Sequence, residues 1–328
     1  QCSDGNPATI LFDVEDLAEP TLVLTPVGGL CETNDITIEA QGGDVDITSY
    51  VFEINDSTVY DGPNNFIVIP KNTRSGDADY TVSVYGRSAT CSTTTVSTTL
   101  RITKPPTLTV TYTTGVVDAN AVCDGDTFTV TVSDTQSSNT TYTLTYPGQA
   151  APVKKFSTTG KATFTLTLTD TKQLTIASEP SSGCGATVTP TVYVPKISNK
   201  GTISYSGTTS LCVGDAFVDG IFSSTSATVV DSSIASVTYK WFYSNGGGEV
   251  LIVDAVSSSL ATAVLQAAIP TVDRSITIYR YAYATRGGKQ CSDGNPATIL
   301  FDVEDLAEPT LVLTPVGGLC ETNDITIE

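Results

Sequence analysis

The stretch Thr-Phe-Thr-Val-Thr-Val at residues 127–132 shows the pattern that decides the fold. Apolar side chains alternate with threonine, so an extended strand would present one apolar face and one polar face. The same alternation returns at residues 107–112 (TLTVTY) and 162–168 (ATFTLTL). β-branched and aromatic residues favour such half-buried pleated surfaces. Short strands of this kind, separated by turn residues, predict an all-β chain.

A cysteine stands just before this strand, and its surroundings occur three times. Cys123 lies in VCDGD (122–126), Cys31 in LCETND (30–35) and Cys212 in LCVGD (211–215). Each has an apolar residue before it, a polar turn after it, and then an alternating strand. Cys91, Cys184 and Cys291 share a second context, because each follows a strongly alternating run.

We predict that each cysteine of the first context pairs with the next cysteine of the second. The expected disulfides are Cys31–Cys91, Cys123–Cys184 and Cys212–Cys291, and Cys2 and Cys320 would pair with residues beyond this stretch. A zinc site is the alternative use of clustered cysteines, but the chain has neither histidine nor a CxxC motif. Disulfides indicate an oxidising, extracellular compartment.

Short proline-marked junctions divide the chain. They predict the end of one domain (1–18), three immunoglobulin-like sandwiches (19–105, 106–196 and 197–307) and the start of another domain (308–328). Domains of about 100 residues with regular short strands are typical of that sandwich. The fold class expected is therefore all-β, with tandem sandwiches in an extended rod and one intradomain disulfide each.

Three aromatic residues of the third domain are expected in its core. Trp241 and Tyr239 lie on a strand where a sandwich buries an aromatic side chain, and Tyr281 lies on a later strand. Residues 257–269 break the β pattern and predict a short helix or a covering loop. We favour a crossover between the sheets.

Residues 1–39 and 290–328 are identical, with an offset of 289 residues. Divergence normally alters the loops of duplicated domains, so this identity predicts a recent tandem array with a 289-residue period. The overlap holds eight of the 35 acidic residues and no basic residue. One period thus has 27 acidic and 16 basic residues and a net charge of −11. Such a polyanionic array is not expected to bind nucleic acid, and the absence of an 18-residue apolar run argues against membrane insertion.

The turn at Cys212–Asp215, the aromatic strand at Tyr239–Trp241 and the late cysteine after a tyrosine-rich strand resemble a known group. They are similar to the immunoglobulin-like or PKD-like repeats of giant secreted surface proteins of gliding Bacteroidota. The segment 19–105 departs from this pattern, with Thr33-Asn34 in place of the glycine and no tryptophan. The resemblance implies export by a dedicated outer-membrane secretion system and a place in an adhesin stalk or a hook-like filament.

Two groups of residues are candidate binding sites, and each has a simpler interpretation. Acidic residues gather at the domain junction as Asp13, Glu15 and Asp16, and recur as Asp302, Glu304 and Asp305. They are weak calcium candidates, and we favour a solvated acidic linker without a cofactor. Tyr279, Tyr281 and Tyr283 alternate on one strand face. A buried core stripe is the favoured interpretation, and an exposed stripe would indicate a carbohydrate-binding, lectin-like module.

Catalysis is not expected, because histidine is absent and the cysteines are predicted to be paired. The sequence therefore predicts a structural repeat unit of an extracellular adhesin stalk or multi-stranded cell-surface filament. Its expected partners are identical copies of itself, in tandem and laterally, with cell-surface glycans as further partners. Extended sandwiches would advance about 120 Å per period.

Overall fold

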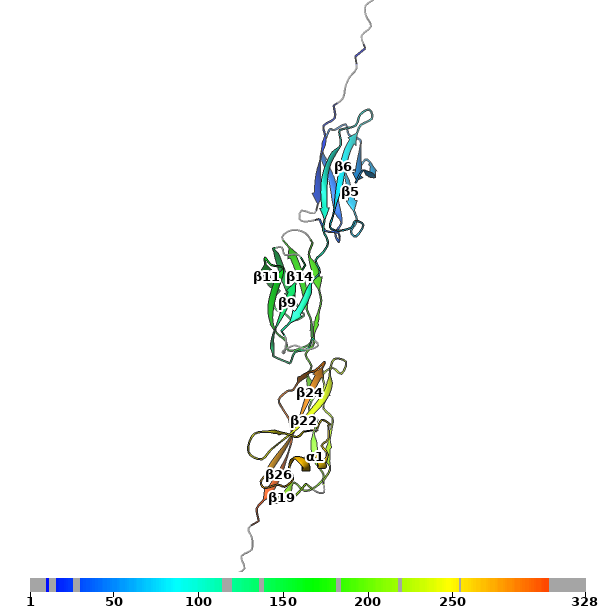
Figure 1. Cartoon of the computed structure of the whole chain (residues 1–328). Coiled ribbons are helices and arrows are strands. Elements are labelled where there is room, and N and C mark those ends of the chain that lie inside the picture. The colour runs from blue at the N-terminus through cyan, green and yellow to red at the C-terminus, as the bar shows by residue number, and fades with distance from the viewer. Residues whose placement is uncertain are drawn as a thin grey trace, which may run out of the picture. The chain divides into compact units, whose positions relative to one another are not determined.

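The computed structural model describes residues 10–11, 16–25, 30–113, 120–135, 139–180, 184–217, 220–253 and 255–306 (Figure 1). These residues form β-strands and one short helix, so the predicted all-β fold class is confirmed.

Two antiparallel sheets enclose the first hydrophobic core. One has the strand order β1-β2-β5, and the other has the order β4-β3-β6-β7. Buried residues from both sheets, including Ile38 of β2 and Phe52 of β3, pack in one cluster. The two sheets therefore form a sandwich. The strands are β1 (Pro20–Thr25), β2 (Ile36–Gly42), β3 (Ser49–Ile54), β4 (Ser57–Gly62), β5 (Phe66–Ile69), β6 (Ala78–Arg87) and β7 (Val96–Ile102).

The next two sheets have the orders β12-β9-β8 and β11-β10-β14-β15, and Figure 1 shows them together as one sandwich. Strict alternation governs burial: β12 carries buried Phe164 and Leu166 between exposed threonines. The strands are β8 (Thr109–Tyr112), β9 (Thr127–Ser133), β10 (Thr140–Thr145), β11 (Val153–Ser157), β12 (Lys161–Thr167), β14 (Thr175–Pro180) and β15 (Ala186–Val188). A separate two-stranded sheet pairs β13 (Lys172–Gln173) with β16 (Thr191–Val192).

A sheet of order β19-β26-β24-β22-β23 dominates the C-terminal part, and two small sheets, β17-β21 and β18-β20, accompany it. Its core surrounds Trp241, which is fully buried. The strands are β17 (Ile197–Asn199), β18 (Ile203–Tyr205), β19 (Ser210–Cys212), β20 (Phe222–Ser224), β21 (Thr228–Val229), β22 (Ser236–Ser244), β23 (Val250–Leu251), β24 (Ile276–Arg286), β25 (Lys289–Cys291) and β26 (Ala297–Glu304).

The irregular stretch at 257–269 contains a real helix. α1 spans Thr262–Ala268 and buries Leu265 in the core around Trp241. The helix alternative is therefore confirmed for these seven residues, and the favoured crossover between the sheets was wrong, because the flanking strands β23 and β24 belong to one sheet.

Two compact units account for the contacts along the chain. One comprises 1–112, 129–166 and 173–191, and the other comprises 113–128, 167–172 and 192–328. The domain boundaries expected from the prolines remain predictions. The terminal segments 1–9, 12–15 and 307–328 lie outside the described residues.

Candidate functional site at two disulfide junctions

The described cysteines form two disulfides, and neither is one of the predicted pairs. Cys31 bonds to Cys184, and Cys123 bonds to Cys291, with Cα–Cα distances of 5.1 and 5.3 Å. The predicted pairs Cys31–Cys91, Cys123–Cys184 and Cys212–Cys291 were therefore wrong. The disulfides also differ from the single intradomain bridge expected for each sandwich, because they join residues 153 and 168 positions apart.

Two of the predicted pairs cannot form because their cysteines lie at opposite ends of a strand. Cys31 forms a parallel bridge with Thr103, just beyond the end of β7, whereas Cys91 precedes the start of β7 at Val96. A strand rises about 3.3 Å per residue, so the seven residues of β7 alone separate the two by roughly 20 Å. A disulfide requires Cα atoms within about 7 Å. Cys212 and Cys291 are separated in the same way by β26, because Cys212 pairs with Glu304 at its far end.

The three cysteines of the first context occupy the same kind of turn. The carbonyl of each accepts a hydrogen bond from the backbone N–H three residues later: Asn34 to Cys31 (3.1 Å), Asp126 to Cys123 (3.1 Å) and Asp215 to Cys212 (3.0 Å). Each turn also lies beside a parallel pairing with a later segment, through Cys31 with Thr103, Ala121 with Tyr193, and Cys212 with Glu304. The similarity of the three sequences therefore corresponds to one local structure.

The cysteines of the second context also share a place in the fold. Cys91 lies in the connection between β6 and β7, Cys184 in that between β14 and β15, and Cys291 in that between β24 and β26. Each connection joins antiparallel neighbours in one sheet. A disulfide junction thus consists of a first-context turn bonded to a second-context connection.

The Cys31–Cys184 junction is closely packed. The exposed fractions of the two side chains are 4% and 1%. The Cys184 sulfur lies 3.0 Å from the carbonyl oxygen and 3.2 Å from the hydroxyl oxygen of Thr103. The Thr103 hydroxyl donates to the Leu30 carbonyl at 3.0 Å, which ties the end of β7 to the cysteine turn.

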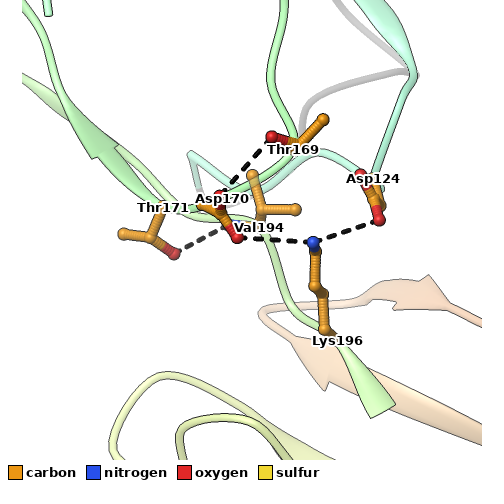
Figure 2. A network of polar contacts seen from close by, with 6 residues as sticks. All are labelled: Asp124, Thr169, Asp170, Thr171, Val194 and Lys196. Atoms are coloured by element: carbon orange, nitrogen blue, oxygen red, sulfur yellow. Dashed lines mark hydrogen bonds and ion pairs between the residues drawn. The ribbon is translucent and has the colours of Figure 1, made fainter. Parts of the chain in front are cut away.

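The Cys123–Cys291 junction is surrounded by charged side chains. Figure 2 shows Lys196 between two carboxylates, with its Nζ 3.1 Å from Asp124 and 3.4 Å from Asp170. Lys289 lies 3.8 Å from Asp126. Partial burial acts to lower the pKa of Lys196, but its hydrogen bonds and charge interactions with Asp124 and Asp170 outweigh burial and raise the pKa. Its cation is therefore held beside the disulfide.

An aromatic contact and a small cavity complete this junction. The guanidinium of Arg286 lies 3.5 Å from the ring centroid of Tyr193 and donates to the Ile234 carbonyl at 2.8 Å. A cavity of about 110 Å³ adjoins the disulfide and is lined by Cys123, Asp124, Pro195, Lys196, Ile197, Cys291, Ser292 and Asp293. Its volume suits a few waters and is below the roughly 300–1,000 Å³ of typical cofactor pockets.

Two of the described cysteines remain thiols. Cys91 is half-buried, and Cys212 is exposed beside Val213, whose exposed fraction is 48%. Cys2 and Cys320 lie outside the described residues.

The acidic calcium candidates are only partly described. Asp16, Asp302, Glu304 and Asp305 are exposed, while Asp13 and Glu15 lie outside the described residues. Asp302 accepts a hydrogen bond from the Ser275 hydroxyl at 2.8 Å. Within the described part of the chain, no group of three or more His, Cys, Asp or Glu residues is arranged to hold a metal ion.

The tyrosine stripe of β24 faces away from the core. Tyr279, Tyr281 and Tyr283 are half-buried, while the alternate residues from Ile276 to Ala284 are buried. The prediction of a buried stripe was therefore wrong, and so was the core position of Tyr281. Trp241 and Tyr239 are buried as predicted, with exposed fractions of 0% and 9%.

The outward tyrosines contact other side chains of β22 and its neighbours. Phe242 packs edge-to-face on Tyr281, with ring centroids 5.5 Å apart, and Lys240 lies 5.0 Å from the ring of Tyr283. The Tyr281 hydroxyl donates to Glu249 at 2.8 Å. Burial and this carboxylate raise the pKa of Tyr281 to about 12.

Arg280 is a structural residue that the sequence did not reveal. It is fully buried and donates to the carbonyls of Lys200 (2.8 Å), Ser258 (2.8 Å) and Thr225 (3.1 Å). Its guanidinium also lies 5.0 Å from the Tyr239 ring, and burial lowers its pKa. The one available signal was its position between Ile278 and Ala282 on the apolar face of an alternating strand.

A larger groove of about 640 Å³ lies between β4 and β5. Most of its lining residues are apolar, and Arg74 is the only lining residue charged at neutral pH. This groove thus lacks the paired acid, base or nucleophile that hydrolytic catalysis uses. No helix in the described segments is long and apolar enough to cross a membrane.

Comparisons with known proteins yield distant structural neighbours. No protein-family model and no curated protein matches the chain. A structure from a 1.5-MDa bacterial ice-binding adhesin is 16% identical, with a TM-score of 0.32, and the match covers 88% of this chain and 99% of that one. A Ca²⁺-stabilized adhesin of an Antarctic bacterium is 15% identical, with a TM-score of 0.32 and coverage of 90% and 75%. Fibronectin(III)-like modules of Clostridium thermocellum CbhA are 10% identical, with a TM-score of 0.33 and coverage of 53% and 94%. Scores this low carry no argument, so the fold rests on the sheets described above.

Proposed function

We propose that this chain is a segment of a tandem extracellular structural array, with three sandwiches per 289-residue period, that forms an adhesin stalk or a surface filament. The observation that carries the proposal is the pair of junctions at Cys31–Cys184 and Cys123–Cys291. Each bonds the turn beside the last strand of one sheet to a connection within another sheet. Covalent links of this kind resist separation of successive parts under load.

Further features support a mechanical role. Disulfides persist in oxidising compartments, which favours an extracellular location. A net charge of −11 per period keeps long arrays soluble. Lys196 and Lys289 beside Cys123–Cys291 are engaged in ion pairs, and the cavity there has room for only a few waters. The array is therefore proposed to be non-enzymatic, to need no cofactor and to bind no nucleic acid.

Lateral association of identical copies is the proposed route to a filament. The edge strand β11 carries exposed Lys154 and Lys155, which discourage uncontrolled strand pairing. On an acidic array these lysines offer complementary charges to acidic segments of a neighbouring copy. Side-by-side contact through ion pairs would weaken with salt.

Electron microscopy of cell-surface material labelled with an antibody to this chain tests the proposal. Extended structures with an axial repeat near 120 Å, about three sandwich lengths, are expected. Thick fibres would identify a filament and single strands a stalk. Label confined to the cell interior, or to compact particles without a repeat, would contradict the proposal.

The outward tyrosines favour carbohydrate binding as a second candidate function. Aromatic faces stack on sugar rings, and Tyr279, Tyr281 and Tyr283 line up on a solvent-facing sheet surface. Glycan-array binding by the intact chain, lost in Tyr279→Ala, would support this role. Tyr50→Ala, which changes a half-buried tyrosine on β3, is the control. Equal glycan binding by both variants would show that the tyrosine stripe is not a carbohydrate-binding site.

A further inference from the structure

We infer that Cys212 and the Cys91 equivalent of the following copy form a third disulfide, which closes the boundary between successive copies. The inference rests on the proposed tandem array and names the partners that the two thiols have there. It begins from a mismatch: six described cysteines occupy two structural contexts, yet only four of them are bonded.

The two bonded pairs follow one rule. In each pair, a first-context turn bonds to the second-context connection of the sandwich that follows along the chain. Cys31 bonds to Cys184 and not to the nearer Cys91, and Cys123 bonds to Cys291 and not to the nearer Cys184. By the same rule, the partner of Cys212 is not Cys291 but a cysteine of the next sandwich. Cys91 likewise requires a partner from the preceding one.

The repeat supplies both partners at the right spacing. The 289-residue offset places the next copy of Cys91 at position 380, which is 168 residues after Cys212. The bonded pair Cys123–Cys291 has the same separation of 168 residues. The separation needed at Cys212 is thus one that this chain already bridges at Cys123.

Local structure shows that both thiols are prepared for the same role. The turn at Cys212 has the hydrogen bond that the turns at Cys31 and Cys123 have, and the Asp215 carboxylate also accepts from the Cys212 N–H at 2.8 Å. The Cys91 connection is held by the Ser88 hydroxyl, which accepts from the Cys91 N–H at 3.0 Å. Cys212 and Val213 are exposed, whereas Cys31 in the equivalent bonded turn is buried. This exposure is expected of a cysteine turn whose disulfide partner lies in the next copy.

The bond formation balances as a two-electron oxidation. The Cys91 and Cys212 thiols together lose two protons and two electrons and gain one S–S bond. A disulfide-bearing thiol oxidoreductase accepts the electrons by exchange and leaves as a dithiol. The same chemistry forms the two observed disulfides.

Non-reducing peptide mapping of the natural full-length protein, alkylated before digestion with trypsin, tests the inference. Cys91 and Cys212 are each the sole cysteine of their tryptic peptides, 88–101 and 201–240. The expected product is a two-peptide species of 88–101 with 201–240. It separates from the products of the other junctions, because Cys291 and Cys320 share one peptide that begins at residue 287 or 290.

Three outcomes would overturn the inference. The first is recovery of both peptides with alkylated cysteines while the Cys31 and Cys123 junctions remain oxidised, which would leave the tandem array intact as a proposal. The second is pairing of Cys91 or Cys212 with any other cysteine. The third is a ladder of disulfide-linked chains on a non-reducing gel that collapses on reduction, which would assign the bond to separate chains. The proposed tandem array would be contradicted by a different result, namely a full-length protein whose sequence does not continue the 289-residue repeat.

Discussion

Arg280 shows how one buried residue connects the loops of the C-terminal sheets. Its guanidinium satisfies three backbone carbonyls, and no carboxylate pairs with it among its described contacts. Substitution of Arg280→Met keeps much of the volume but leaves the three carbonyls unpaired. Such groups cost about 1–3 kcal/mol each when buried, so we expect the free energy of unfolding to fall by about 3 kcal/mol.

Urea unfolding followed by fluorescence measures this effect locally, because Trp241 is the only tryptophan and lies 5.9 Å from Arg280. Arg274→Met is the matched control. Arg274 is largely exposed and pairs with Asp273 at 3.4 Å, so its loss should change stability by less than about 0.5 kcal/mol. Equal effects of the two substitutions would contradict the structural role of Arg280.

Tyr281 gives the same region a dependence on alkaline pH. Burial, with the hydrogen bond to Glu249, raises its folded-state pKa to about 12, whereas an unfolded tyrosine titrates near pH 10. The folded state therefore retains the proton more strongly. The resulting stability is fully present below pH 10 and is lost as pH rises from about 10 to 12.

Because Tyr281 is partly exposed, solvent screening limits its contribution to less than about 1 kcal/mol. The urea midpoint of Trp241 fluorescence should fall between pH 9 and 12, after Cys91 and Cys212 are alkylated to prevent exchange. The urea midpoint of Tyr281→Phe should fall less steeply over this pH range. Tyr80→Phe, on another sheet, is the control and should keep the original slope. An unchanged slope in Tyr281→Phe would show that other groups set the alkaline limit.

The alternating sequence of β24 predicts that it is a strand with one buried face, but it does not predict which face is buried. The period of two correctly indicated a strand with one buried face. It did not indicate which face, because the buried face carries Arg280 and the outward face carries three tyrosines. Residue type alone favours the opposite arrangement. The carbonyls of Lys200, Ser258 and Thr225 place Arg280 on the buried face by accepting its hydrogen bonds. They lie up to 80 residues from Arg280 in sequence.

At the scale of elements, the turn between β17 and β18 depends on one glycine. Gly201 has φ of +69°, and a Cβ there would lie 2.2 Å from the Thr225 carbonyl oxygen and 2.7 Å from the Arg280 guanidinium. Gly201→Ala would displace the backbone that Arg280 holds. We expect it to destabilise the fold by more than about 2 kcal/mol, from left-handed strain and steric overlap together.

Gly248→Ala is the control for that substitution, since no atom lies within 4 Å of the Cβ position and its φ is not left-handed. Thermal unfolding monitored through Trp241 compares the two. Similar melting temperatures for Gly201→Ala and the unaltered chain would show that the turn adapts without cost.

Elements also explain why the cysteine contexts were predictable and their partners were not. The spacing of apolar, cysteine and turn residues indicated three like turns, and the structure confirms one hydrogen-bonding pattern at all three. Pairing depends instead on which ends of strands meet in space. The length of β7 separates Cys31 from Cys91, and that separation appears only once the parallel bridge at Thr103 is known.

Across the whole molecule, the two disulfides limit how far the chain can be pulled out. The loops 31–184 and 123–291 overlap, so the shortest covalent path from Cys31 to Cys291 crosses both bonds and only the 61 residues between Cys123 and Cys184. At about 3.5 Å per residue, the fully unfolded oxidised path extends roughly 210 Å, against about 910 Å for the 260 residues of the reduced chain.

Single-molecule pulling of the chain can identify which cysteines are bonded as well as whether bonds exist. In Cys184→Ser the remaining bond, Cys123–Cys291, leaves a path of the 92 residues from Cys31 to Cys123, or about 320 Å. If the bonds closed single sandwiches as Cys31–Cys91 and Cys212–Cys291, the same variant would expose 121 residues from Cys91 to Cys212, or about 420 Å. Cys91→Ser is the control, because Cys91 is a thiol in this chain and its loss should leave the oxidised length unchanged. A length near 420 Å in Cys184→Ser, or a longer oxidised path in Cys91→Ser, would contradict the disulfides Cys31–Cys184 and Cys123–Cys291.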